Sequence, residues 1–341
     1  MRRLANVLGI NSLQPLPLLH NATIELLKTS KNLVAFSGGG DSTALFFLLL
    51  EHGITFDIAH VNYQTRAQSD AEEAYAKTLA TTHHKHLFSL TCKLEESNFE
   101  HHAREERYAF FETILHEHSY DTLLMAHHLG DQLEWFLMQL SRGAGLVEML
   151  GMQEVEMRKA YTLVRPLLHV SKKTLQNYLH EHKITYFNDE SNASLKHLRN
   201  QFRHDYATPL IDAYEEGIAK SFAYLSEDRK RLLPHQAKRI GDLFIVLRDA
   251  DDLINIRQID KIIKQLGTLL TKAQRDEILK TKNCVVGGKI AVCFEEERIF
   301  IAPYLKHAME KKFKEACRKA RIPLKIRPYL HARGLDPNAL R

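Results

Sequence analysis

The chain has 341 residues, of which 44% are hydrophobic and 26% charged, a composition that is typical of folded domains and excludes a disordered protein. This length predicts two or three domains rather than one. The longest apolar run, residues 44–50, is far shorter than the ~20 residues that cross a bilayer, and residues 1–3 do not open a signal peptide. We therefore expect a cytoplasmic protein with no membrane partner. The formal net charge of +5 is too small to indicate nucleic acid by itself.

Strand patterns and helix patterns alternate along the first part of the chain. Strands are expected at residues 33–36, 55–61, 86–90 and 122–126, and helices at 43–51, 69–80, 100–118 and 131–140. This alternation predicts an α/β fold with an open, mostly parallel sheet and helices on both faces. In such sheets ligands bind beyond the carboxyl ends of the strands. Polar residues lie at the carboxyl ends of three of the strands: Ser37, His60 with Asn62, and His127 with His128.

The pattern changes near residue 213. Helices are expected up to residue 233, then a strand at 244–247, a helical segment at 258–279, a hairpin at 284–294 with a two-glycine turn, and a strand at 298–302. We therefore divide the chain into a catalytic domain, residues 1–213, and a C-terminal region, residues 214–341, with a helical segment and a small α+β module. Eight basic residues between Lys311 and Arg327 form either a phosphate-binding surface or a solvated basic helix, and charge alone does not decide between them.

The most informative element is the loop between the first strand and the first helix. It consists of Ser37, Gly38, Gly39, Gly40, Asp41 and Ser42. Glycines let the main chain approach an anion closely, and the N-terminus of the following helix adds positive potential. Asp41 would repel a phosphate unless a cation lay between them, which makes Mg²⁺ binding its natural role. The lysine of a Walker A loop is absent, so the pattern predicts a phosphate-binding loop of another kind.

With this loop in place, the chain resembles the PP-loop, or N-type, ATP pyrophosphatases, and among them the tRNA(Ile)-lysidine synthetases. The resemblance rests on an ordered set of further motifs at residues 60–66, 103–108, 126–134, 142–146, 165–168, 189–192 and 199–203. It implies that ATP adenylates the wobble cytidine of a tRNA(Ile) with a CAU anticodon and that free lysine then displaces AMP. The sequence departs from the family pattern at Tyr63, Gly130 and Trp135, and we expect Trp135 to be a core residue.

The resemblance also implies roles for particular residues. His60 and Asn62 would bind ATP, and Arg107 would stabilise charge at the α-phosphate. Asp131 and Glu134, three apart on one helix, would hold lysine, and Asp131 would also take part in catalysis. Arg104, Arg199 and Arg203 would contact tRNA, although ion pairs of Arg199 and Arg203 with Asp189 or Glu190 are an equal alternative for those two arginines. A homodimer is compatible with the sequence, which does not fix the oligomeric state.

Two other functions compete with this prediction. A tRNA thiolase of the same superfamily would normally need reactive or cluster-binding cysteines. The four cysteines, Cys92, Cys284, Cys293 and Cys317, are scattered without a C-x-x-C pair, which argues against thiolation and against a zinc ribbon or an iron–sulfur site. A non-catalytic RNA-binding protein with a decayed loop is also conceivable. The presence of Ser37, Asp41, Asp131 and the arginines argues against decay.

Overall fold

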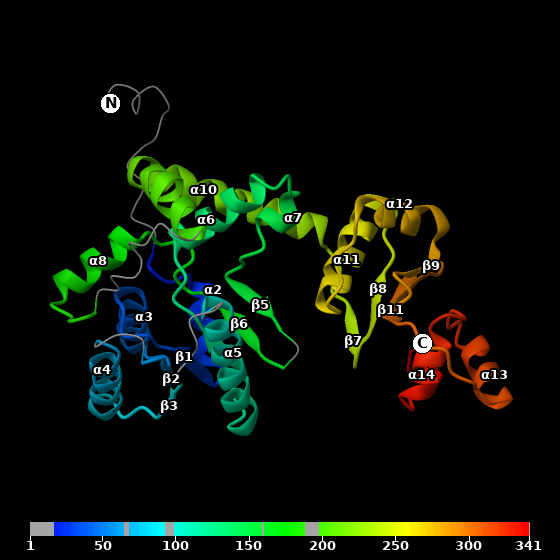
Figure 1. Ribbon diagram of the computed structural model, residues 1–341, viewed down its shortest axis with the longest axis horizontal. Helices are drawn as coiled ribbons and strands as arrows, with labels where there is room; N and C mark the ends of the chain where they lie inside the picture. The colour runs from blue at the N-terminus through cyan, green and yellow to red at the C-terminus, as the bar shows by residue number, and fades with distance from the viewer. Residues whose placement is uncertain (1–16, 65–67, 93–98, 159, 188–197, 341) are drawn as a thin grey trace. The chain divides into compact units, whose positions relative to one another are not determined.

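A computed structural model describes residues 17–64, 68–92, 99–158, 160–187 and 198–340 (Figure 1). The chain separates into two compact units, residues 1–224 and 225–341. The long helix α10 (Thr208–Leu232) runs across this boundary, and its backbone leaves the helical conformation at Tyr214 (φ −141°, ψ 32°). The change of sequence pattern near residue 213 therefore coincides with a kink in this helix.

The N-terminal unit is built on a six-stranded sheet in the order β3-β2-β1-β4-β6-β5. Its strands are β1 (Asn32–Ala35), β2 (Phe56–Asn62), β3 (Leu87–Thr91), β4 (Thr122–Leu124), β5 (Val155–Met157) and β6 (Thr162–Val164). All neighbouring pairs are parallel except β5 with β6. The four strands predicted from the sequence are confirmed, whereas the two short strands β5 and β6 were not predicted. The mostly parallel α/β class is therefore confirmed.

Helices cover both faces of this sheet. They are α2 (Asn21–Lys28), α3 (Gly40–Glu51), α4 (Ser69–Thr82), α5 (Phe99–Glu117), α6 (Leu129–Leu140), α7 (Leu146–Met149), α8 (Lys172–Glu181), α9 (Leu198–Gln201) and the π-helix η2 (Phe202–Ala207), followed by α10. Alternate residues of one strand point to opposite faces. Val34 accordingly packs in a core with α2, α3, α4 and α8, and Leu33 in a second core with α5.

The C-terminal unit has its own antiparallel sheet, in the order β7-β8-β11-β10-β9. Its elements are β7 (Lys238–Ile240), β8 (Leu243–Leu247), α11 (Asp252–Gln265), α12 (Lys272–Thr281), β9 (Asn283–Val286), β10 (Ile290–Phe294), β11 (Arg298–Pro303), α13 (Lys311–Lys319), α14 (Arg327–Ala332) and the 3-10 helix η3 (Pro337–Leu340). The predicted helical segment at 258–279 is two helices, separated near Gly267 (φ +80°). The predicted hairpin is β9–β10, and its Gly287 and Gly288 both have positive φ.

Each face of the C-terminal sheet carries an apolar core. One core includes α11 and α12, and the other includes α13 and α14 with Ile326, Tyr329 and Leu330. This agrees with the α+β module expected at the end of the chain. Among the described residues, none of the helices combines the length and the apolar character that a bilayer crossing requires.

Candidate active site

The loop after β1 is closed by hydrogen bonds among its own residues. The Ser42 hydroxyl donates to the carbonyl of Gly39 (3.0 Å), and the Gly39 N–H donates to the hydroxyl oxygen of Ser37 (3.3 Å). Helix α3 begins at Gly40, so Asp41 lies in its first turn. A tight turn that leads into a helix N-terminus gathers main-chain N–H groups at one place, which favours an anion there.

Close packing explains why this loop needs glycine. Gly38 has φ +84°, a conformation that L side chains rarely adopt, and its carbonyl accepts a hydrogen bond from the N–H of Phe187 (3.0 Å). A Cβ added at Gly40 would lie 3.2 Å from the ring of Tyr186. The loop is therefore held between α4 and the segment after α8, with its exposed side toward a cavity.

A cavity of about 570 Å³ opens at the carboxyl ends of β1, β2 and β4, where sequence analysis placed the ligand site. The side chains that line it include Ser37, Asp41, Ser42, Tyr63, Arg107, His127, His128, Asp131, Lys172, Lys173, Arg199 and Arg203. A smaller cavity of about 170 Å³ lies beside the loop and shares Ser37, Asp41, Ser42 and Lys172 with the first. These residues come from elements that are far apart in the sequence.

His128 links the loop to the start of α6. Its Nδ1 accepts a hydrogen bond from the N–H of Gly130 (3.0 Å), while the main-chain N–H of His128 donates to the Asp131 carboxylate (3.1 Å). An acceptor Nδ1 leaves the ring hydrogen on Nε2. That Nε2 lies 3.7 Å from Asp41 and 3.6 Å from Asp131. The imidazole N–H is thus placed between the two carboxylates, one on each wall of the cavity.

Asp131 and Glu134 are buried and paired with two arginines. Arg203 donates to Asp131 (3.1 Å) and to Glu134 (2.9 Å), and Arg199 contacts both carboxylates as well. Only 2% of the Glu134 side chain is exposed, against 45% of Arg199. Burial by itself would raise the pKa of Asp131, but the neighbouring His128, His127, Arg203 and Arg199 outweigh it and hold the pKa well below its usual range.

These contacts bear on the alternatives for the two arginines. Asp189 and Glu190, the partners considered from the sequence, lie outside the described residues. Among the described residues, Arg199 and Arg203 pair with the two carboxylates expected to hold lysine. The acidic pair and the basic pair predicted separately therefore belong to one network at the cavity wall.

Arg104 and Arg107 have different surroundings although both lie on α5. Arg107 lines the cavity, and its buried Nε has no hydrogen-bond partner among the described residues. Arg104 is exposed and lies over the Tyr108 ring, 4.8 Å from its centroid. Of these two arginines, Arg107 is the one that lines the cavity. Tyr63 packs on the same helix by donating to the carbonyl of Ala103 (2.8 Å).

His60 and Asn62 are buried on the α4 side of β2, whereas Val61 and Tyr63 from the same segment line the cavity. The His60 Nδ1 lies 3.0 Å from the carbonyl of Phe36, the residue that precedes the loop. Asn62 donates to Asp70 (3.0 Å) and Glu73 (2.9 Å). These hydrogen bonds fix the ends of the strands beside the loop. The assignment of His60 and Asn62 to ATP binding stays a prediction.

The structure places Trp135 at the surface. Its side chain is 38% exposed and its indole N–H donates to the carbonyl of Glu148 (3.1 Å), so the prediction that it is a core residue was wrong. Its exposure follows from its place on α6, one residue after the buried Glu134 and thus turned away from the cavity wall.

Comparison with known proteins identifies the family. The PP-loop domain family matches residues 16–210, more than half of the chain. The chain is 47% identical to the tRNA(Ile)-lysidine synthase of Wolinella succinogenes over 314 residues, 92% of this chain and 96% of that protein. It is 47% identical to the Campylobacter jejuni tRNA(Ile)-lysidine synthase over 319 residues (93% and 97%) and 42% identical to the Helicobacter pylori one over 315 residues (92% and 93%). The chain belongs to the tRNA(Ile)-lysidine synthase family.

The predicted family and the prediction that the protein is an enzyme are thereby confirmed, and the PP-loop domain implies that it uses ATP. Sequence analysis did not single out Lys172 and Lys173, which line the cavity of this tRNA(Ile)-lysidine synthase family member from the start of α8. The sequence signal for their position was Ser171, a residue type that favours the N-cap of a helix. In the structure Ser171 caps α8 by accepting from the N–H of Thr174 (3.1 Å), which puts both lysines in the first turn.

Proposed function

We propose that the protein joins the ε-amine of lysine to C2 of the wobble cytidine in tRNA(Ile) with a CAU anticodon. In the first step the cytidine O2 attacks the α-phosphate of ATP and pyrophosphate leaves. In the second step the lysine amine attacks C2, and the oxygen leaves with AMP. The observation that carries this proposal is a single cavity with the glycine-rich loop on one wall and the buried Asp131 on the other, where Arg203 joins Asp131 to the buried Glu134. Holding two reactants side by side supplies a large part of the rate enhancement.

The loop wall would bind ATP. Ser37, Gly38, Gly39, Gly40 and Ser42 would supply main-chain N–H groups and hydroxyls to the phosphates. Asp41 fits a Mg²⁺ ligand, because its carboxylate lines both cavities and stays 32% exposed, and Mg²⁺ keeps several waters beside one or two carboxylates. A bound Mg²⁺ would neutralise part of the phosphate charge. His60 and Asn62 would support ATP binding indirectly, by fixing the ends of the strands beside the loop.

Arg107 would stabilise the charge that develops at the α-phosphate. It enters the cavity from α5, and its buried Nε has no hydrogen-bond partner among the described residues, so this donor is available to a substrate oxygen. A preorganised cation in a buried site is among the strongest means of stabilising such charge.

The carboxylate wall would receive lysine. The depressed pKa of Asp131 keeps it ionised at neutral pH, as holding the lysine ammonium requires. A carboxylate with so low a pKa is a weak base, so the catalytic part of Asp131 would be to position the amine for attack. Because Arg199 and Arg203 already pair with Asp131 and Glu134, the lysine ammonium would share or replace these contacts. Arg199 and Arg203 are partly exposed, which suits contact with tRNA phosphates. Arg104 would extend this contact on the outside of α5.

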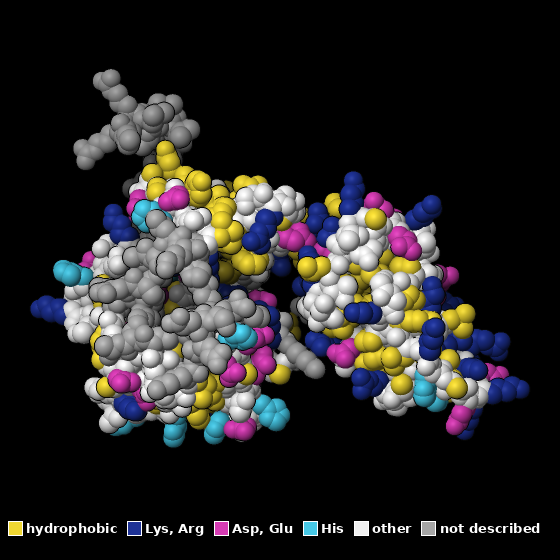
Figure 2. All heavy atoms as spheres, viewed as in Figure 1, with side chains coloured by type: hydrophobic (Ala, Val, Ile, Leu, Met, Phe, Trp, Pro, Cys, Tyr) yellow, Lys and Arg dark blue, Asp and Glu magenta, His cyan; other side chains and the backbone are white. Residues whose placement is uncertain are grey.

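The C-terminal region, residues 214–341, would bind the rest of the tRNA, and residues 1–213 would carry both chemical steps. Lysines and arginines are spread over the visible face of the C-terminal unit in Figure 2. On α13 the basic side chains Lys311, Lys312, Lys314 and Arg318 are exposed, while Cys317 packs into the core. Such an arrangement suits phosphate contacts. With tRNA and ATP as substrates the enzyme would act in the cytoplasm, and a homodimer is compatible with the proposal.

Thiolation is disfavoured by the position of the cysteines. Cys284, Cys293 and Cys317 are buried in the C-terminal unit, and within the described part of the chain no cysteine lines the cavity. Burial raises the pKa of Cys293 to about 12, so that thiol is a poor nucleophile.

The test is a reaction of the purified protein with α-labelled ATP, lysine and tRNA(Ile) bearing CAU. The proposal predicts labelled AMP, and lysine incorporated into the tRNA, with no product when the wobble cytidine is replaced. AMP formation that needs a sulfur donor, or no AMP at all, would contradict it.

A further inference from the structure

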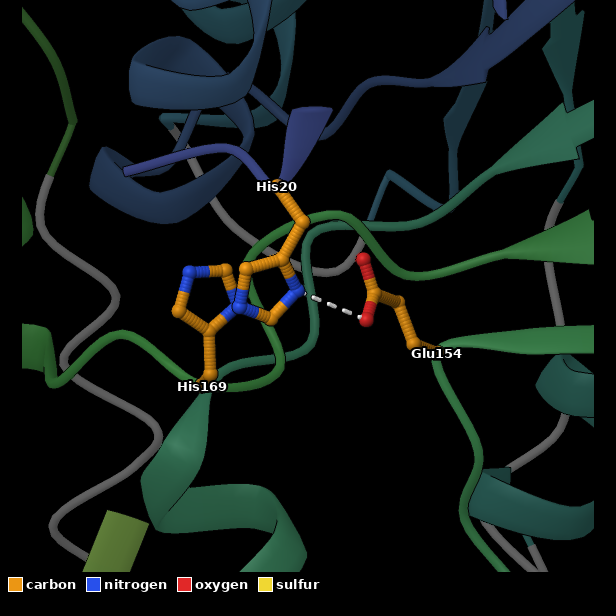
Figure 3. A group of neighbouring side chains, drawn as sticks. All are labelled: His20, Glu154 and His169. Carbon is orange, nitrogen blue, oxygen red and sulfur yellow. Dashed lines mark hydrogen bonds and ion pairs between the residues drawn. The ribbon is translucent and has the colours of Figure 1, made fainter. Parts of the chain in front are cut away.

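A second cluster of polar side chains lies apart from the cavity, within the N-terminal unit. It consists of His20, which directly precedes α2, Glu154, which precedes β5, and His169, which precedes α8 (Figure 3). One nitrogen from each imidazole and one carboxylate oxygen all lie within 4.8 Å of one another. None of the three residues lines either cavity described above. The function proposed above therefore does not account for this cluster.

His169 has the hydrogen bonding of a ligand that lacks its ion. Its Nε2 lies 2.8 Å from the carbonyl oxygen of Pro17. A carbonyl only accepts, so Nε2 carries the hydrogen and Nδ1 presents a lone pair. That Nδ1 is buried and has no hydrogen-bond partner among the described residues. Metal-binding histidines usually donate their other ring N–H to a carbonyl or a carboxylate, which is the arrangement at His169.

His20 and Glu154 complete the set of donors. The His20 Nδ1 lies 3.0 Å from one carboxylate oxygen of Glu154, and the Thr23 hydroxyl donates to the other. The two imidazole rings stack, with centroids 3.7 Å apart and planes 13° from parallel, and in Figure 3 the Glu154 carboxylate points toward the His20 ring.

We propose that His20, Glu154 and His169 bind one divalent transition-metal ion, with Zn²⁺ the best match, and that a water completes a four-coordinate site. Two imidazoles and a carboxylate are a ligand set that Zn²⁺ favours. Tetrahedral Zn²⁺ needs ligand atoms roughly 3.3 Å apart, each imidazole pointing its lone pair at the ion, so binding would turn one ring out of the present stack. The carbonyl of Pro17 and the Thr23 hydroxyl would orient His169 and Glu154.

Such an ion would tie together three separate parts of the chain. It would join the start of α2 to the segments before β5 and α8. The residue after His169, Val170, accepts a hydrogen bond from the N–H of Leu129 (2.9 Å), the first residue of α6. The metal site would therefore help to fix the segment that supports the helix carrying Asp131 and Glu134, which makes its role structural.

Metal binding by the full-length chain tests this proposal directly. The metal-free protein is titrated with Zn²⁺ against a chromophoric chelator, and with Co²⁺ while visible absorption is recorded. We expect one tight equivalent of Zn²⁺ and the strong visible bands of four-coordinate Co²⁺. His20→Ala, His169→Ala and Glu154→Gln should each weaken Zn²⁺ binding by more than about 100-fold, and Thr23→Val by about tenfold.

Two controls keep the result interpretable in a chain with 20 histidines. His52→Ala removes an exposed histidine outside the cluster and should leave the tight site unchanged. Glu154→Gln preserves side-chain shape, so it should fold, as circular dichroism can check, even if an alanine variant does not. The proposal is overturned if the wild-type chain has no tight site, or if Glu154→Gln binds Zn²⁺ as well as the wild type does.

Discussion

The two walls of the cavity are built in opposite ways. The loop wall is six consecutive residues, Ser37 to Ser42, held by bonds within the loop and by close packing of glycines. The carboxylate wall joins Asp131 and Glu134 on α6 to Arg199 and Arg203 on α9 and η2, which follow more than sixty residues later. The loop presents main-chain donors to an anion, whereas the carboxylate wall already holds its charges in pairs. An anion can therefore bind at the loop wall directly, but a cation must compete with Arg199 and Arg203 at the carboxylate wall.

If the loop wall carries the first chemical step, substitution of its one acidic residue, Asp41, should reduce the rate of that step the most. Asp41→Asn keeps the size of the side chain but removes the charge proposed to hold Mg²⁺. We expect the rate of pyrophosphate release to fall by about 1,000-fold. The measurement is single-turnover release of pyrophosphate from ATP and tRNA(Ile). A fall of less than about tenfold would show that Asp41 does not hold the metal.

The carboxylate wall should be separable from the first step. Glu134→Gln removes a negative charge that pairs with Arg199 and Arg203. We expect the KM for lysine to rise by about 10- to 100-fold, the range for losing a hydrogen bond to a charged group, while pyrophosphate release stays within about threefold of wild type. Steady-state kinetics at varied lysine concentration measures both. An equal loss in both steps would mean that the two walls do not act separately.

Lys172 tests whether the loop wall extends to α8, because this residue lines both cavities. Its side chain is exposed, so the effect should be smaller than at the buried positions. Lys172→Ala should raise the KM for ATP by about three- to tenfold with little change in kcat. Lys173→Ala, which lines only the larger cavity, is the matched control and should change the KM for ATP less. Equal effects would remove the case for a specific contact at Lys172.

His127 offers a test by pH at the base of the cavity. Burial lowers its pKa to about 4 from an ordinary value of 6.5. The folded state therefore binds this proton less readily than the unfolded chain, so the free energy of unfolding should fall as the pH drops from about 6.5 to about 4. NMR of the histidine ring protons, assigned with His127→Gln, should show no titration of His127 above about pH 5. A midpoint above pH 6 would contradict this burial.

The loop wall was predictable from the sequence because its residues are contiguous. Ser37, the three glycines and Asp41 follow an apolar strand and precede a helix, so local chemistry defines their arrangement. Asp131 and Glu134 were also found, since their spacing puts them on one helix face. That Arg199 and Arg203 pair with them could not be read from spacing, because tertiary packing of α9 and η2 against α6 creates those contacts.

Other differences between the predicted and the observed structure have equally local causes. His60 and Asn62 were placed at the correct strand end, but the alternation of side chains along β2 turns them toward α4 and turns Val61 and Tyr63 into the cavity. Which of the two alternating sets of side chains lines the cavity depends on the face of the sheet that the cavity occupies. The short strands β5 and β6, with three residues each, carry too little pattern to be recognised.

The most direct test of the two-wall account follows the label from α-labelled ATP in the absence and then in the presence of lysine. We predict that the wild-type enzyme transfers label to tRNA(Ile) without lysine and releases it as AMP when lysine is added. Glu134→Gln should accumulate labelled tRNA and release it slowly, whereas Asp41→Asn should form none. Label that never becomes attached to tRNA, or that both variants retain equally, would contradict the account.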